Sequence, residues 1–296
     1  MFENIIGNEK VKEYLQTSIY NKKTFHSYIF VGVEGIGKKI MAMEFSKRLL
    51  CIEKGIKQCK CKACVEFESK NHPDFTLIEP QGNNIGISQI RTLQGKIQEK
   101  PIISNKKIYI IDNAEKMTSE AQNCLLKTLE EPPEYAIIIL ISANENLLLD
   151  TIKSRCLILH FEHIKDNELK EYLKNDGNFE NINEDILKAF QGSIGKAIKL
   201  KDKIEKYQQI GDMLKKIQKE DLLDFLKMAK PIYESKDDIY SILEYMNVML
   251  LELSKENTQY TKCVKIVENT RERLKCNSNY DMSIDNMLFN IWREIN

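Results

Sequence analysis

The sequence lacks a long apolar run, because its longest, residues 136–141, is far too short to span a bilayer. Residues 1–15 carry charges from Glu3 onward and contain no apolar core, so we expect no secretory signal. An excess of charge is also absent, since 44 basic residues balance 44 acidic ones. This balance excludes a dominant electrostatic attraction to nucleic acid and leaves only local patches for such contact. Together these absences predict a cytoplasmic protein with no membrane partner.

Cysteine, in contrast, is plentiful, and the eight cysteines of such a chain are expected to be thiols or metal ligands rather than disulfides. Four of them are closely spaced: Cys51, Cys59, Cys61 and Cys64. Four thiolates on a small knuckle provide the tetrahedral ligand set of structural zinc. The spacing of Cys61 and Cys64 is a favoured one, whereas Cys59 and Cys61 are closer than usual. We therefore predict a structural Zn²⁺ site over residues 51–64, with four unrelated thiols as the alternative.

The first half of the chain alternates short apolar segments with helical periods. Its 296 residues, 42% of them hydrophobic, have room for two domains and a substantial core. Strands are expected over residues 27–31, 75–78, 107–111, 136–141 and 157–159. Helices are expected between them over residues 38–50, 88–98, with Ser88 as N-cap, and 118–129. This alternation predicts an α/β fold with a parallel sheet covered on both faces.

The α/β pattern ends near His163, and only helical periods follow it. The first of these helices are short and suit a small lid, and the later ones are long enough to form a bundle that serves as an oligomerisation surface. The predicted divisions are an α/β module over residues 1–162, a helical lid over 163–203 and an all-α domain over 204–296.

The most distinctive motif is a phosphate-binding loop, G-x-x-x-x-G-K, with Gly32, Gly35, Gly37 and Lys38. It follows a predicted strand and leads into a predicted helix, an arrangement that directs a helix N-terminus at an anion. The motif continues with a serine or threonine whose hydroxyl binds Mg²⁺. This chain has Lys39 at that position, and its ammonium has no lone pair for a metal. The loop predicts a nucleotide site short of one metal ligand, and the alternative is a glycine turn without a ligand.

A second segment of the same site is degenerate as well. Asp112 ends a buried strand as in a Walker B segment, where the carboxylate would lie beside Mg²⁺, although an Asp that caps a turn is the alternative. The glutamate that usually follows is here Asn113, an amide that cannot act as a base. Asn144, after the next strand, is a candidate for contact with a γ-phosphate, but turn chemistry explains it equally well.

Arg155, in the segment Ser154-Arg155-Cys156, is a candidate arginine finger, a planar cation offered to a transferring phosphoryl group. Taken from this segment alone, a surface arginine in an ion pair is the favoured interpretation.

Several of these segments together resemble bacterial DNA polymerase III clamp-loader subunits. The resemblance rests on the phosphate loop, the cysteine knuckle, NHPD at 71–74, LLKTLEEPP at 125–133 and SRC at 154–156. It covers roughly residues 1–200 strongly and the helical tail only by position and length.

Two kinds of subunit in that family are compatible with the fold. Gamma/tau is the ATPase motor, with an intact phosphate loop, an acidic Walker B pair and an arginine in its second sensor, whereas delta-prime has a decayed nucleotide site. The departures at Lys39, Asn113 and Gly195 favour the delta-prime type. The alternatives are an active AAA+ motor, of the gamma/tau or helicase-loader kind, and a stand-alone zinc-knuckle protein that binds nucleic acid. The last leaves the phosphate loop unexplained.

The resemblance implies a RecA-like AAA+ module with a zinc knuckle, a helical lid and a helical collar domain through which five subunits assemble. Delta and gamma/tau subunits would be the partners, and the assembly would load the sliding clamp onto primed DNA. Arg155 would then reach the ATP of a neighbouring gamma/tau subunit, which reverses the interpretation of that residue from its own segment. The loop that contains Lys38 would form a nucleotide cradle together with Asp112 and Asn144. Weak binding of ATP or ADP in this cradle is compatible with the resemblance. We expect no ATP hydrolysis by the chain alone.

Overall fold

The computed structural model describes residues 2, 5–53, 59–175 and 184–296. The chain forms two compact units, Met1–Lys165 and Asp166–Asn296. The predicted divisions at 162/163 and 203/204 stay predictions. Among the described residues, no helix combines the length and the apolar character needed to cross a membrane.

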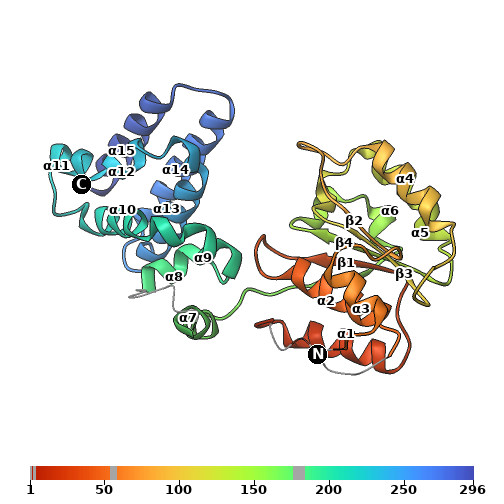
Figure 1. Ribbon diagram of the computed structural model, residues 1–296. Coiled ribbons are helices and arrows are strands. Elements are labelled where there is room, and N and C mark those ends of the chain that lie inside the picture. The colour runs from red at the N-terminus through yellow and green to blue at the C-terminus, as the bar shows by residue number, and fades with distance from the viewer. Residues whose placement is uncertain (1, 3–4, 54–58, 176–183) are drawn as a thin grey trace. The chain divides into compact units, whose positions relative to one another are not determined.

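The first unit is built on a five-stranded sheet in which every pair of neighbours is parallel, in the order β2-β3-β4-β1-β5 (Figure 1). The strands are β1 (Ser27–Val31), β2 (Phe75–Ile78), β3 (Lys107–Ile111), β4 (Ala136–Ser142) and β5 (Leu157–His160). The predicted parallel sheet is confirmed, and β4 and β5 each extend one residue beyond the predicted end.

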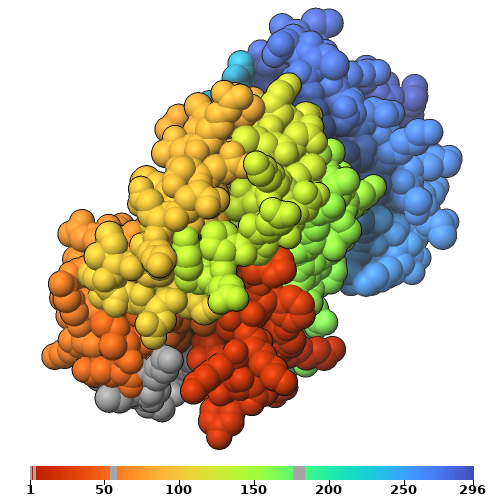
Figure 2. Space-filling view, turned by 90° about the vertical axis from the view of Figure 1, so that its right-hand side faces the viewer, coloured from red at the N-terminus to blue at the C-terminus, as the bar shows by residue number. Residues whose placement is uncertain are grey.

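Helices cover both faces of this sheet (Figure 1). On one face lie α1 (Glu9–Tyr20), α2 (Lys38–Leu50) and α3 (Lys62–Glu68), and on the other α4 (Ile87–Ile97), α5 (Ser119–Glu130) and α6 (Asp150–Lys153). Side chains alternate along a strand, so Tyr28 and Phe30 of β1 pack with the first group and Ile29 and Val31 with the second. This two-sided burial explains why most residues of the strands are apolar. On the face shown in Figure 2, the red, orange and yellow segments of this unit lie against one another.

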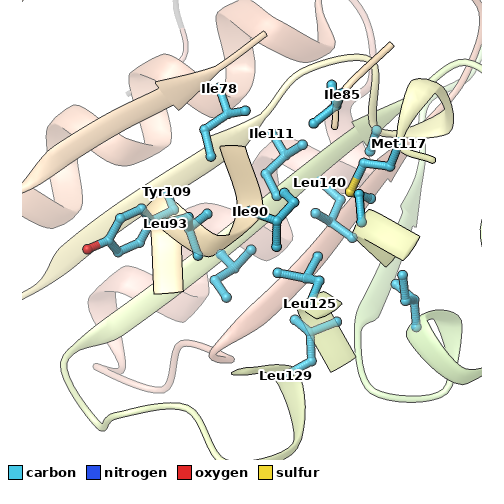
Figure 3. Close-up of a cluster of buried hydrophobic side chains, with 14 of the residues drawn as sticks. Ile78, Ile85, Ile90, Leu93, Tyr109, Ile111, Met117, Leu125, Leu129 and Leu140 are labelled. Atoms are coloured by element: carbon cyan, nitrogen blue, oxygen red, sulfur yellow. The ribbon is translucent and has the colours of Figure 1, made fainter. Parts of the chain in front are cut away.

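The core between α4, α5 and the sheet is shown in Figure 3, where Ile90 and Leu93 of α4, Leu125 and Leu129 of α5 and Ile111 of β3 belong to one buried cluster. Each of these five side chains is at most 1% exposed. Truncation of such a side chain to alanine typically costs about 2–5 kcal/mol, because a cavity remains in the core. The core therefore fixes the helices against the sheet and holds the strand ends in place.

The start of one helix differs from the prediction. Thr118 caps α5 as its position suggests, since its side chain accepts the Ala121 N–H at 3.2 Å. Ser88, however, is not the N-cap of α4, because Gly86 takes that position and the helix begins at Ile87. The physical reason is local: the Gly86 N–H donates to Oε1 of Gln89 at 3.1 Å, which starts the helix one residue before Ser88. Helix α1 lies outside the predicted elements.

A buried polar network joins the segment 71–74 to the chain before β3. The Asp74 carboxylate, fully buried, accepts backbone N–H groups from Ile102 at 2.7 Å and from Ile103 and Ser104 at 2.8 Å. His72, 4% exposed, accepts the Asp74 N–H at its Nδ1, at 3.0 Å. Because Nδ1 accepts, the neutral imidazole carries its proton on Nε2, which lies 3.3 Å from the Ser104 hydroxyl.

We expect this network to make stability depend on pH. Burial lowers the pKa of His72 below its ordinary value of 6.5, although the charges of Asp74 and Glu66 oppose that effect. The unfolded chain therefore binds the proton more readily than the folded chain. The contribution of His72 to stability is complete above pH 6.5 and decreases as the pH falls toward its lower folded pKa.

The measurement is thermal unfolding of the wild type and His72→Gln between pH 5 and 8. The wild type should lose more stability than the variant below about pH 6.5. Parallel pH profiles for the two proteins would contradict this role of His72.

The described residues of the second unit form helices and the turns that join them, without a strand. Its helices are α7 (Asp166–Asn175), α8 (Glu184–Phe190), α9 (Ile194–Leu200), α10 (Ile204–Lys216), α11 (Leu222–Met228), α12 (Lys230–Tyr233), α13 (Ile239–Leu253), α14 (Tyr260–Lys275) and α15 (Tyr280–Ile295). Helix α13 packs against α10 and α14, and α14 packs against α15. The expectation that only helices follow the sheet is confirmed for the described residues.

Candidate functional site

The carboxyl ends of β1, β3 and β4 meet at one edge of the sheet, since the three strands are parallel neighbours. Gly32 follows β1 and its N–H donates to the Ser142 carbonyl at the end of β4, at 3.2 Å. Asp112 follows β3, and its N–H donates to the Ile78 carbonyl at the end of β2, at 2.9 Å. This is the edge at which open parallel sheets bind ligands.

The loop between β1 and α2 depends on glycine. Gly32, Gly35 and Gly37 have φ angles of 154°, 80° and 94°, in the region that side chains rarely adopt. A Cβ at Gly32 would lie 2.6 Å from Cδ1 of Ile36 and 2.8 Å from the carbonyl oxygen of Phe161. The loop can therefore keep its curved backbone only with glycine at this position.

Lys38 lies folded into the loop that precedes it. Its Nζ donates to the carbonyl oxygens of Gly32 and, at 2.7 Å, of Val33, and the residue is 6% exposed. Burial lowers the pKa of Lys38, and the charges of Glu115, Asp112 and Glu34 oppose that effect. The loop carbonyls thus hold the cation that a phosphate would attract.

Lys39, the departure from the phosphate-loop rule, bridges two carboxylates. Its Nζ lies 2.9 Å from Oδ2 of Asp112 and 2.5 Å from Oε1 of Glu79. The other carboxylate oxygen of Asp112, Oδ1, accepts the N–H of Asn113 at 3.1 Å. Burial by itself lowers the pKa of Lys39, but the hydrogen bonds and charges of Glu79 and Asp112 outweigh it, so the pKa is raised. An ammonium therefore lies against the predicted Walker B carboxylate.

Glu79 was not among the predicted site residues. A usable signal exists in the sequence, because Glu79 directly follows β2 and so lies at the same sheet edge as Asp112.

Asn144 caps a local turn. Its side-chain oxygen accepts the Asn146 N–H at 3.0 Å, and the residue is exposed. Its backbone N–H donates to the Ser142 hydroxyl at 3.2 Å. The role of Asn144 at a nucleotide stays a prediction.

The four clustered cysteines come together between the end of α2 and the start of α3. Their Sγ atoms all lie within 4.8 Å of one another, and those of Cys51 and Cys61 are 4.0 Å apart. Sulfurs bound to one zinc ion at about 2.3 Å would be about 3.8 Å apart, so the cluster has the dimensions of a tetrahedral site. Cys51, Cys59 and Cys64 are buried, and none of the four forms a disulfide. The cluster can hold a metal ion. Residues 54–58 of the predicted knuckle lie outside the described residues.

The environment of the cluster favours a thiolate at Cys61. Burial acts to raise the pKa of this thiol, but hydrogen bonds from the backbone N–H groups of Cys64 and Ile52, and from neighbouring thiols, lower it to about 6. Burial and the neighbouring thiols raise the pKa of Cys64. Metal ions bind thiolates rather than thiols, so metal binding would release protons from the thiols that are not yet ionised.

Arg155 is one of the residues that line a pocket on the first unit, and in the sequence it lies far from the phosphate loop. Its NH2 contacts Oε1 of Glu130 at 2.6 Å and its NH1 donates to the Thr151 carbonyl at 2.8 Å. The side chain is 34% exposed. The pocket has a volume of about 460 Å³, and its other lining residues include Phe25, His26, Leu129, Ser154, Cys156 and Leu157. Arg155 is thus oriented by the last turn of α5, the LLKTLEEPP segment.

Comparison with known proteins identifies the family to which the chain belongs. Residues 7–165 match the family described as "DNA polymerase III, delta subunit". Over 165 residues, 55% of this chain and 50% of the relative, the chain is 39% identical to DNA polymerase III subunit delta' of Bacillus subtilis (strain 168). It is 36% identical over 136 residues to subunit delta' of Pseudomonas aeruginosa, covering 45% of this chain and 42% of the relative.

Another relative is DNA polymerase III subunit tau/gamma of Haemophilus influenzae, 32% identical over 68% of this chain and 30% of the relative. The chain thus spans about half or less of the length of these curated relatives. A solved structure of a DNA polymerase III gamma subunit-related protein from Thermotoga maritima shares the fold, with a TM-score of 0.51 and 21% identity over 95% of this chain and 99% of that one. The chain belongs to the DNA polymerase III delta-subunit family, among the bacterial delta-prime clamp-loader subunits.

Proposed function

We propose that the chain works as a largely non-hydrolysing AAA+ subunit that helps load a sliding clamp onto primed DNA. The observation that carries this proposal is the ion pair of Lys39 with Asp112, at 2.9 Å, because it occupies the carboxylate that an active motor uses for Mg²⁺. The position that follows Asp112, where an active motor has its glutamate base, holds the amide of Asn113. We therefore expect no ATP turnover by the isolated chain, and the pairing argues against the alternative of an active motor.

The proposed contribution of the chain to ATP chemistry is Arg155, offered as an arginine finger to a neighbouring gamma/tau subunit. Three features support the proposal. The side chain is partly exposed, it borders a pocket, and its guanidinium is oriented by Glu130 and the Thr151 carbonyl. A planar guanidinium held in this way can turn toward phosphoryl oxygens and form two parallel hydrogen bonds with them.

The metal of the cysteine cluster is proposed to be zinc with a structural role. Four sulfur ligands fill a tetrahedral shell and leave no open position for a substrate, so the ion would hold the end of α2 to the start of α3.

The proposed partners are delta and gamma/tau subunits in a hetero-pentamer, with the clamp and primed DNA engaged by the assembly. Mixing the purified chain with delta and gamma/tau from the same organism tests this directly. The chain should elute from a sizing column with both partners, and the two partners without it should give a smaller species. Elution of the chain as a separate monomer would contradict the proposal.

A further inference from the structure

The cradle at the end of β1 does not fit the magnesium ion that its fold family implies. Mg²⁺ requires oxygen ligands in a nearly octahedral arrangement. The serine or threonine that directly follows the phosphate-loop lysine normally supplies one of these oxygens. Here that residue is Lys39, which offers only N–H donors. Its ammonium also lies 2.9 Å from Oδ2 of Asp112, where the metal or its water would be expected.

We propose that the Lys39 ammonium stands in place of Mg²⁺, so that the cradle binds a nucleotide polyphosphate free of divalent metal. The inference deepens the proposed function, on which it rests, and uses the predicted nucleotide cradle of Gly32, Gly35, Gly37 and Lys38.

The charges around Lys39 support this assignment. Its ammonium is shared between Asp112 and Glu79, which come from the ends of two neighbouring strands. Both carboxylates are therefore neutralised in part, and their attraction for a second cation is reduced. A divalent ion brought to Asp112 would also meet the ammonium at contact distance, where like charges repel. Metal-bound nucleotide is disfavoured for both reasons.

The same arrangement leaves the phosphate-binding groups themselves in place. The glycines keep the loop curved, and the N-terminus of α2 has no side-chain cap on its N–H groups. Lys38 is held by the carbonyls of Gly32 and Val33, contacts that a phosphate can replace. Because these groups are backbone N–H donors and one ammonium, they can meet phosphate oxygens without a metal.

The test is the affinity for a fluorescent ATP analogue, measured in excess Mg²⁺ and in EDTA. For the wild type the two dissociation constants should agree within about twofold, or favour EDTA. Lys39→Thr, which restores the hydroxyl and frees Asp112, should bind at least about tenfold more tightly in Mg²⁺ than in EDTA. Lys47→Thr is the matched control, because Lys47 also lies on α2 and pairs with a carboxylate, that of Glu68 at 2.7 Å. It should behave as the wild type.

A second readout follows the metal itself. Electron paramagnetic resonance of Mn²⁺ with the analogue should show a protein-bound ion for Lys39→Thr and none for the wild type. Lys39 is 42% exposed, so the variant should fold, and its thermal unfolding checks this; Lys39→Ser serves as a second hydroxyl variant.

Three results would overturn the inference: wild-type binding that strengthens about tenfold on addition of Mg²⁺, no gain of metal dependence in Lys39→Thr, or no binding of the analogue by any variant. None of them concerns the assembly with delta and gamma/tau, so co-elution with those subunits tests that part of the proposed function separately.

Discussion

Replacing Arg155 by alanine is expected to slow ATP hydrolysis at the neighbouring gamma/tau site by on the order of 10³-fold, because an arginine supplied in trans stabilises the charge of the transferring phosphoryl group. The fold should survive the substitution. The Arg155–Glu130 pair joins side chains that are 34% and 49% exposed, and such surface pairs contribute about 0–1 kcal/mol. Assembly should therefore be unchanged while hydrolysis is lost.

The measurement is single-turnover hydrolysis by the reconstituted loader, together with clamp loading on primed DNA. Arg155→Lys keeps the charge but loses the planar fork, so it should recover only a small part of the rate. Arg48→Ala is the matched control, because Arg48 is an ion-paired arginine of the same unit, 3.0 Å from Glu44, and lies far along α2 from the phosphate loop. Hydrolysis by Arg155→Ala at the wild-type rate would remove the finger assignment.

Removal of the metal should have the largest effect on stability. We expect purified protein to contain one zinc ion per chain and Cys64→Ser to contain none. Without the ion, three buried thiols lose the partner that holds the end of α2 to the start of α3. The resulting loss is expected to be at least about 3 kcal/mol, a fall in Tm of about 6–12 °C for a unit of this size.

Metal analysis and thermal unfolding, with and without a chelator, test this expectation. Cys276→Ser makes the same substitution at an exposed cysteine outside the cluster, so its metal content and Tm should match the wild type. Purification without chelator that yields no zinc, or a chelator that leaves Tm unchanged, would contradict a structural zinc site.

Much of the first unit could be predicted from sequence because its signals are local. Strands buried on both faces are nearly continuous apolar segments, as residues 108–111 and 136–141 are. The cysteine cluster was predictable for a related reason, since its four cysteines lie close together in the chain, from the end of α2 to the first turn of α3. The start of α4 was missed because a glycine N-cap, whose N–H donates to the side chain of Gln89, competes with the more usual serine.

The interactions that define the site could not be predicted, because they join residues far apart in sequence. The sequence identifies Lys39 as a missing hydroxyl but does not indicate that its ammonium reaches Glu79 and Asp112. That contact requires the order of β2, β3 and β1 in the sheet. The pairing of Arg155 with Glu130 depends in the same way on the packing of α5 beside the chain before β5. The roles proposed for these residues follow from such contacts.

Native mass spectrometry of the reconstituted mixture tests most directly whether this chain is a working member of a clamp loader. The mass of the assembly formed with delta and gamma/tau subunits gives the number of copies of each chain. We predict a five-subunit species that contains one copy of this chain and is absent when it is omitted. A five-subunit species that forms equally well without this chain, or a mixture in which the chain remains monomeric, would contradict the account.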